Sequence, residues 1–381
     1  MDRDYFSSRT YDQSRETFRG LLATIRGRWP GAVLTAHRVD DDEDLTIDVI
    51  EAPAEGGESG PGRQRIVILT CGQHGVEAFV GAAMLRLFTA EFLDRLDPRT
   101  TGLILVHAIN PWGMRHFRRV DRDNVDLNRN FVWDWGATRG ANPDYRRIAG
   151  LLAPEGKIDS ALSERVRFYA GVTRATVSGQ IEAFKRATLL GQYEFPRGLY
   201  YGGTAPSPST TVMTSLYRRT MERYAQVLHL DMHTGYGPAD LMNVVGSAHE
   251  PRGSIELQQA FAYPRVVAAT PGEFYGILGD MIDYVYLLAR RDFPRLRLYA
   301  ASFEFGTVGD SLLSGLESLR RMVAENRACW NGARRGADAE NIQQDFVALF
   351  APSSRRWREA ALANARQAFA GILRAEGFIT G

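Results

Sequence analysis

Four short apolar runs constrain the fold of this chain most strongly. Each run is bounded by turn or polar residues, and together they cover residues 66–70, 103–106, 226–231 and 298–303. Continuous apolar runs, in contrast to alternating ones, are typical of strands in a sheet that is covered on both faces. Helical patterns separate the runs, and strands that alternate with helices indicate an α/β fold.

The domain organisation follows from the same pattern. Helices are expected at 10–28, 76–96, 209–225, 310–324 and 355–374. No clean linker interrupts the chain, so residues 1–381 are expected to form a single domain. Residues 134–205, with a helix expected at 160–186, are interpreted as an elaboration on the sheet.

Composition excludes several classes of protein. Hydrophobic residues make up 44% of the chain, which is enough for a sizeable core, and the net charge of +1 argues against a nucleic-acid partner. Two cysteines, Cys71 and Cys329, cannot form a disulfide framework. The first residues lack the apolar segment of a signal peptide, and no apolar run reaches 18 residues. A cytoplasmic protein without a membrane partner is therefore expected, and the sequence does not define its oligomeric state.

The first apolar run is followed by His74 and Glu77. In open α/β sheets, ligands bind outside the carboxyl ends of the strands. A separation of three residues lets both side chains point to one locus, and both are good zinc ligands. Taken alone, however, the pair is better interpreted as an ordinary strand–turn–helix in which Glu77 is a favourable charge at the helix start.

The third run ends in His229, Asp231 and His233, which share one face of an extended chain. His233 is a candidate third metal ligand, because it ends the strand just before a turn. Asp231 could orient an imidazole by accepting a hydrogen bond from the ring nitrogen that does not bind the metal. His229 is interpreted as a core histidine.

The fourth apolar run is followed by a glutamate, and the second is followed by a charge-rich loop. Glu304 lies between two phenylalanines, and it is either a general base beside a metal or a buried acid paired with an arginine. The pair Arg118 and Arg119 precedes the stretch DLNRNF at 126–131. An arginine grips a carboxylate with a planar fork or stabilises an oxyanion. The alternative is a solvated loop.

Taken together, these motifs resemble the zinc carboxypeptidase (carboxypeptidase A-like) superfamily. They occur in the family's order: HGVE at 74–77, NPWG at 110–113, the arginine pair at 118–119, DLNRNF at 126–131, DMHTG at 231–235 and FEFGT at 303–307. The chain looks most like a bacterial branch of that superfamily. It also has some likeness to the succinylglutamate desuccinylase/aspartoacylase branch.

The resemblance implies a mixed, largely parallel central sheet with helices on both faces. It also implies one zinc ion per chain, held by His74, Glu77 and His233. Glu304 is then the general base and Arg119, in preference to Arg118, faces the oxyanion. The substrate-binding set implied is Arg118, Asn128 and Arg129, the last two on the substrate's carboxylate. No tyrosine of the family's site can be assigned, although the candidates are Tyr275, Tyr284 and Tyr286.

The expected activity is zinc-dependent hydrolysis of an amide bond next to a free carboxylate, with a small peptide as substrate. One alternative is a deacylase of N-acyl amino acids of the aspartoacylase type. Another is a catalytically silent binding module that keeps the metal pocket. A serine hydrolase is poorly supported because no G-x-S-x-G elbow occurs. A nucleotide-binding protein is not indicated either, since a Walker A run is missing.

Overall fold

The structure is a computed structural model of the chain. It describes residues 4–40, 43–56, 64–178, 184, 186–188, 190–267 and 278–380. In these residues one eight-stranded sheet has the strand order β1-β2-β4-β3-β5-β8-β6-β7. The strands are β1 (Val33–Asp40), β2 (Leu45–Ala52), β3 (Arg65–Cys71), β4 (Thr101–His107), β5 (Gln226–Thr234), β6 (Met242–Gly246), β7 (Val266–Val267) and β8 (Arg297–Phe305).

The four strands predicted from the apolar runs are adjacent at the centre of the sheet. Strands β4, β3, β5 and β8 pair in parallel, each with the next. Strands β1, β2 and β6 add antiparallel pairings toward the two edges, and β7 pairs in parallel with β6. The predicted mixed, largely parallel sheet is therefore confirmed. Because the central strands are parallel, their carboxyl ends meet at one edge.

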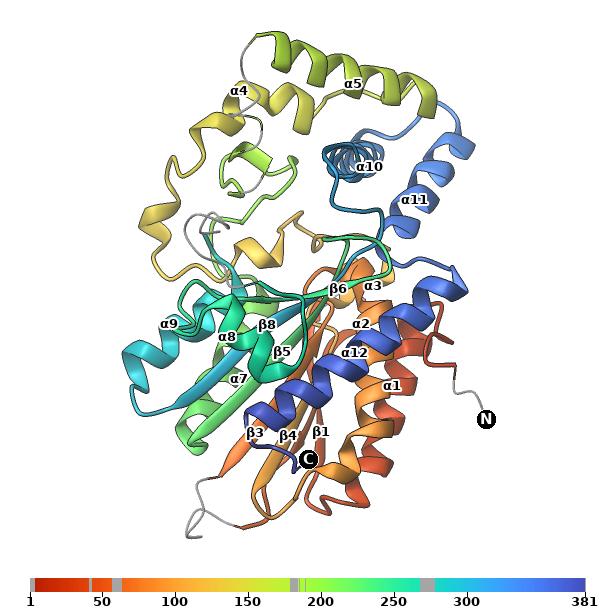
Figure 1. Cartoon of the computed structure of the whole chain (residues 1–381). Helices are drawn as coiled ribbons and strands as arrows, with labels where there is room; N and C mark the ends of the chain where they lie inside the picture. The colour runs from red at the N-terminus through yellow and green to blue at the C-terminus, as the bar shows by residue number, and fades with distance from the viewer. Residues whose placement is uncertain are drawn as a thin grey trace.

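Helices cover both faces of the sheet, as predicted (Figure 1). Residues alternate along each central strand, so that Val67 and Leu69 of β3 join one core while Ile66 and Ile68 join the other. The first core is shared with α1 (Tyr11–Arg26), α2 (Ala78–Glu91), α8 (Ser254–Phe261) and α12 (Arg355–Ala375), and the second with α7 (Pro208–Arg223) and α9 (Met281–Asp292).

A separate layer of helices lies beyond the carboxyl ends of the strands (Figure 1). We call it the helical cap; it comprises α4 (Pro143–Leu152), α5 (Ala161–Val177), the loop 190–205, α10 (Leu312–Asn331) and α11 (Gly336–Phe350). Its core joins Tyr145 of α4, Phe168 of α5 and Leu319 of α10. The elaboration predicted at 134–205 thus packs against helices that follow the last strand. The helix predicted at 160–186 is α5, which ends at Val177; much of the rest of that prediction lies outside the described residues.

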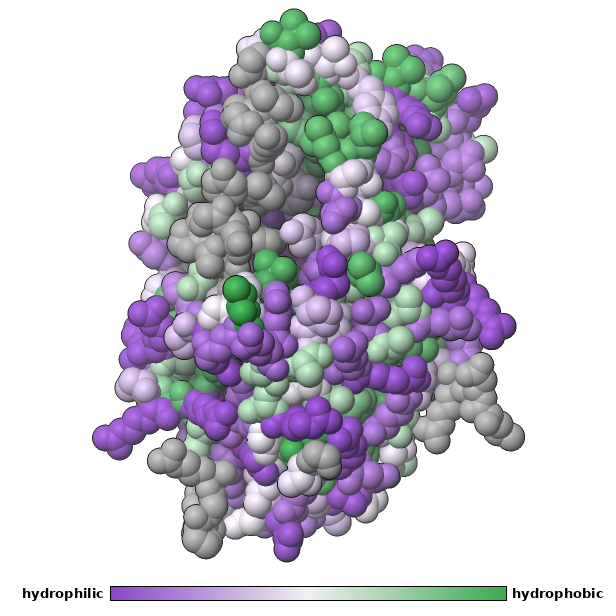
Figure 2. Space-filling view, in the orientation of Figure 1, coloured by the Kyte–Doolittle hydropathy of each residue, from purple (hydrophilic) through white to green (hydrophobic). Residues whose placement is uncertain are grey.

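The surface is largely polar on the face shown in Figure 2, with apolar side chains gathered chiefly on the helical cap. Leu162 and Val166, one turn apart on α5, are both exposed. None of the helices in the described part of the chain combines the length and the apolar composition that a bilayer-spanning segment needs.

Candidate metal centre

The carboxyl ends of β3, β5 and β8 bring three separate motifs together. His74 follows β3 and precedes the 3-10 turn η1 (Gly75–Glu77), which leads directly into α2. His233 is the penultimate residue of β5 and Glu304 the penultimate residue of β8. The two are directly opposite in the parallel register, so their side chains leave the same face of the sheet.

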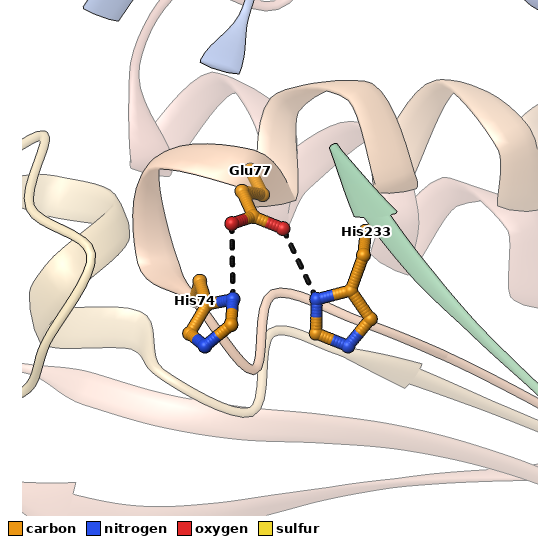
Figure 3. A group of neighbouring side chains, drawn as sticks. All are labelled: His74, Glu77 and His233. Carbon is orange, nitrogen blue, oxygen red and sulfur yellow. Dashed lines mark hydrogen bonds and ion pairs between the residues drawn. The ribbon is translucent and has the colours of Figure 1, made fainter. Parts of the chain in front are cut away.

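Glu77 lies between the two imidazoles (Figure 3). Its Oε1 is 2.9 Å from Nδ1 of His74, and its Oε2 is 3.1 Å from Nδ1 of His233. The ring centroids are 5.0 Å apart, and one ligand atom from each of the three residues lies within 4.8 Å of the others. We call His74, Glu77 and His233 the metal group. All three side chains are buried.

The outer nitrogens of both imidazoles face carboxylates. Nε2 of His74 is hydrogen-bonded to Oδ1 of Asp126 at 3.1 Å, and Nε2 of His233 lies 2.6 Å from Oδ2 of Asp231. With a metal ion bound, a carboxylate at Nε2 would keep the proton there and leave the Nδ1 lone pair free for the ion. Nδ1 of His74 is correspondingly a buried atom without a hydrogen-bond partner in the described structure.

This arrangement fits a divalent metal ion. The imidazole nitrogens and the carboxylate that converge in this buried space are held together by protons in the metal-free protein, and a divalent cation could take the place of those protons. Imidazole nitrogen and carboxylate oxygen together are the donor set of a catalytic zinc site, which uses three protein ligands. The residues that the sequence predicted as ligands are thus placed where they could hold such an ion.

The two adjacent arginines point in different directions. Their carbonyl oxygens accept hydrogen bonds from Gly75 and Val76, which holds this extended segment against η1. Arg119 reaches Oε1 of Glu77 at 3.1 Å and Oδ2 of Asp126 at 3.3 Å. Arg118 instead turns to the helical cap, where its guanidinium donates to Glu325 and Asn326 of α10, each at 2.9 Å. Arg119 therefore lies at the metal group, whereas Arg118 is engaged by α10.

Asn128 and Arg129 lie in η3 (Leu127–Arg129). Asp126, which directly precedes η3, links this segment to the metal group by its hydrogen bond to His74. Oδ1 of Asn128 accepts hydrogen bonds from Nε2 of Gln73 and from the backbone N–H of Met281, both at 3.0 Å. Its Nδ2 donates to Oδ2 of Asp280 at 3.0 Å. Most of the hydrogen-bonding capacity of the Asn128 side-chain amide is therefore used within the protein. Arg129 is buried, and one of its guanidinium nitrogens donates to the carbonyl oxygen of Asn128.

Glu304 titrates far from the usual range of a glutamate. Burial raises its pKa to about 8, and the nearby carboxylates of Glu77 and Asp231 act in the same direction, while His233 and Arg119 lower it. The charges that act on Glu304 are therefore those of the metal group and its partners. A carboxyl group with a pKa near neutral pH is well suited to accept and return a proton.

Comparison with known proteins identifies the family. A family model described as "Protein of unknown function (DUF2817)" matches residues 6–364. The chain belongs to the DUF2817 family. No curated protein sequence matches it significantly.

The solved structures that resemble this DUF2817 chain include metallocarboxypeptidases. Bovine thrombin-activatable fibrinolysis inhibitor is 12% identical, with a TM-score of 0.48 over 95% of this chain and 100% of that chain. Carboxypeptidase A from Helicoverpa armigera is 14% identical, with a TM-score of 0.46 over 95% of this chain and 76% of that one. A metallo-carboxypeptidase from Burkholderia cenocepacia is 14% identical, with a TM-score of 0.39 over 92% and 69% of the two chains.

Several residues around the metal group of this DUF2817 protein were not assigned from the sequence. Asp126 opens the DLNRNF motif, but nothing in the sequence shows that it bonds His74, which lies 52 residues earlier. The negative charge of Asp126 was the one sequence feature that could have pointed to a partner such as an imidazole. Of the three candidate tyrosines, Tyr286 donates to Glu250 and Tyr284 packs against Trp133, while Tyr275 lies outside the described residues.

Proposed function

We propose that the chain is a zinc-dependent hydrolase that cleaves an amide bond next to a free carboxylate. The observation that carries this proposal is the metal group itself, in which two Nδ1 atoms and one carboxylate converge while aspartates occupy both outer nitrogens. One zinc ion per chain fits this donor set. A general-base candidate, Glu304, and an arginine, Arg119, adjoin the same group.

The chain's own residues supply the proton transfers. A divalent cation held by the metal group provides Lewis-acid chemistry for attack on the carbonyl carbon. Glu304 accepts a proton from the attacking water as the new C–O bond forms. It then gives that proton to the leaving nitrogen as the C–N bond breaks. Arg119 donates hydrogen bonds to the carbonyl oxygen as it gains negative charge.

Arg129 is the residue that we assign to bind the free carboxylate of the substrate. This side chain is buried at the junction between η3 and the helical cap, and Asn128 fixes the backbone around it. Glycines allow the surrounding chain to come close: a Cβ on Gly191 would lie 2.5 Å from Cδ of Arg129, and one on Gly279 would lie 2.3 Å from its carbonyl oxygen. The chain is therefore packed closely around Arg129. The substrate we propose is a small peptide or an N-acyl amino acid.

Metal affinity should rise with pH. In the metal-free protein, burial alone would lower the pKa of His233, but Asp231 and Glu77 raise it well above its ordinary value. His233 is therefore protonated near neutral pH, and a bound metal has to displace that proton. Below the raised pKa, affinity should increase about tenfold per pH unit for one displaced proton. Competition with a chelator between about pH 6 and pH 8 measures this slope, and a flat profile would contradict it.

Metal analysis followed by a substrate panel tests the proposal. The purified protein should contain about one zinc ion per chain. It should hydrolyse dipeptides or N-acyl amino acids, but not the same compounds with the carboxylate converted to an amide. A chelator should abolish turnover and zinc should restore it. Zinc retention without turnover on any member of the panel would instead identify a silent binding module, and hydrolysis restricted to N-acyl amino acids would identify the deacylase.

A further inference from the structure

A row of polar side chains runs from the metal group into the core between the sheet and α7. Along β5, His229, Asp231 and His233 are spaced by two residues, so they leave the same face of the strand. Thr70 of β3 is directly opposite Asp231 in the parallel register. These four side chains are all buried, and the ring of Tyr217 from α7 packs against that of His229 with centroids 5.2 Å apart. Polar groups buried this deeply need hydrogen-bond partners, and these residues find them in one another.

Thr70 joins two of these side chains. Its Oγ1 lies 2.5 Å from Oδ1 of Asp231 and 2.9 Å from Nε2 of His229. A hydroxyl at 2.5 Å from a carboxylate oxygen donates its proton to that oxygen. Because Thr70 has only one proton to donate, it accepts the hydrogen bond from His229. His229 therefore donates to Thr70 and Thr70 donates to Asp231. We call these three residues the hydrogen-bond line.

His229 is suited to be the donor that starts the hydrogen-bond line. Burial lowers its pKa to about 4, so the imidazole is neutral near pH 7 and carries one ring proton. Its Nδ1 is buried without a hydrogen-bond partner in the described part of the chain. A buried N–H without an acceptor is costly, so the proton belongs on Nε2, which faces Thr70. The hydroxyl of Tyr217, 3.5 Å from the same nitrogen, donates to Sδ of Met281 at 3.1 Å.

Asp231 connects the hydrogen-bond line to the metal group. Its Oδ1 is held by Thr70, and its other carboxylate oxygen, Oδ2, lies 2.6 Å from Nε2 of His233. On the far side of the same imidazole, Nδ1 lies 3.1 Å from Oε2 of Glu77. The orientation of the His233 ring thus depends on a carboxylate that the Thr70 hydroxyl keeps from rotating.

We propose that Thr70 and His229 are positioning residues for the metal ligand His233. They act through Asp231, which they fix in the orientation that holds the imidazole. The inference rests on the proposed function only for the presence of the metal ion, and it does not depend on which bond the protein cleaves. Residues that support a metal-binding histidine from outside the ligand set typically change metal affinity by about 10-fold to 100-fold when they are replaced.

The test compares the wild type with Thr70→Val, which replaces the hydroxyl by a methyl group of similar size. Zinc affinity of the purified protein is measured by competition with a chelator. In the variant, Asp231 lacks its donor at Oδ1, so zinc should bind about 10-fold to 100-fold more weakly. Thr70→Ser restores a hydroxyl at the same place and should regain most of the wild-type affinity.

Thr89→Val is the matched control. Thr89 of α2 is also buried, and its hydroxyl donates to the carbonyl oxygen of Leu85 at 2.9 Å, outside the hydrogen-bond line. Each substitution removes one buried threonine hydroxyl, so a merely structural role of Thr70 would give both variants the same zinc affinity. Thr89→Val should instead bind zinc like the wild type.

His229→Phe tests the far end of the hydrogen-bond line. It removes the donor to Thr70 and keeps a ring, so zinc affinity should fall. In the Thr70→Val background the same substitution should have no further effect, since His229 acts only through the hydroxyl. His107→Phe is its control, because His107 is equally buried but its Nε2 bonds Ser14 at 2.8 Å. If Thr70→Val fails to fold, the comparison of these two histidine variants decides the inference.

Four results would overturn the inference: wild-type zinc affinity in Thr70→Val or His229→Phe, a loss that Thr70→Ser does not restore, an equal loss in the control variants, or additive losses in the double variant. The wild type binds zinc in each of these cases, so the proposed function stands. A wild type that binds zinc but hydrolyses no substrate would overturn the proposed function alone. A wild type that binds no zinc would overturn both.

Discussion

Glu304→Gln is expected to lower kcat by about 100-fold to 10,000-fold while zinc content stays at the wild-type level. Glutamine keeps the shape of the side chain but cannot accept the proton from water. Burial raises the pKa of Glu304 to about 8, and the charges of His233 and Glu77 act on the same carboxyl group. Steady-state kinetics and metal analysis on the same preparation measure both effects.

Glu359→Gln provides the matched control for this prediction. Glu359 lies on α12 with an exposed side chain that pairs with Arg355. The same chemical change there should leave kcat and zinc content unaltered. If Glu304→Gln retained full turnover, another group would have to serve as the base. If it lost zinc, Glu304 would belong to the ligand set.

His233→Ala is expected to release the metal. Binding free energies of about 10–16 kcal/mol for four-ligand zinc sites correspond to about 3 kcal/mol per ligand, or roughly a 100-fold loss of affinity for each ligand removed. The remaining Nδ1 of His74 and the carboxylate of Glu77 would then have to hold the ion alone. Zinc content after dialysis and chelator competition measure the loss, and turnover should disappear with the metal.

His249→Ala controls for the removal of an imidazole as such. His249 lies after β6 and contacts Arg290, outside the metal group. This variant should bind zinc with wild-type affinity. Undiminished zinc binding by His233→Ala would mean that the ion, if present, has other ligands, and the assignment of the metal group would have to be abandoned.

The central sheet could be predicted because its strands are buried on both faces. Such strands are apolar at most positions, and the polar residues at and after their ends mark the edge where their carboxyl ends meet. The sequence pattern therefore predicts His74, His233 and Glu304 at one edge of the sheet. Strands β6 and β7, the last two at one side of the sheet, are short and were not predicted, since so few residues show no clear periodicity.

The parts of the site that depend on side-chain direction could not be predicted. Arg118 and Arg119 are chemically identical neighbours, yet the side chain of Arg119 reaches Glu77 and that of Arg118 reaches Glu325. Both outcomes are set by tertiary contacts and not by local patterns.

The helical cap draws its core from stretches of chain that flank the central strands in sequence. Tyr145 and Phe168 precede β5 and β8, whereas Leu319 follows both. During synthesis, α4 and α5 therefore leave the ribosome without the helix that completes their packing. Every strand of the sheet precedes α10 in the chain, so the core of the helical cap can be completed only after β8 has been synthesised.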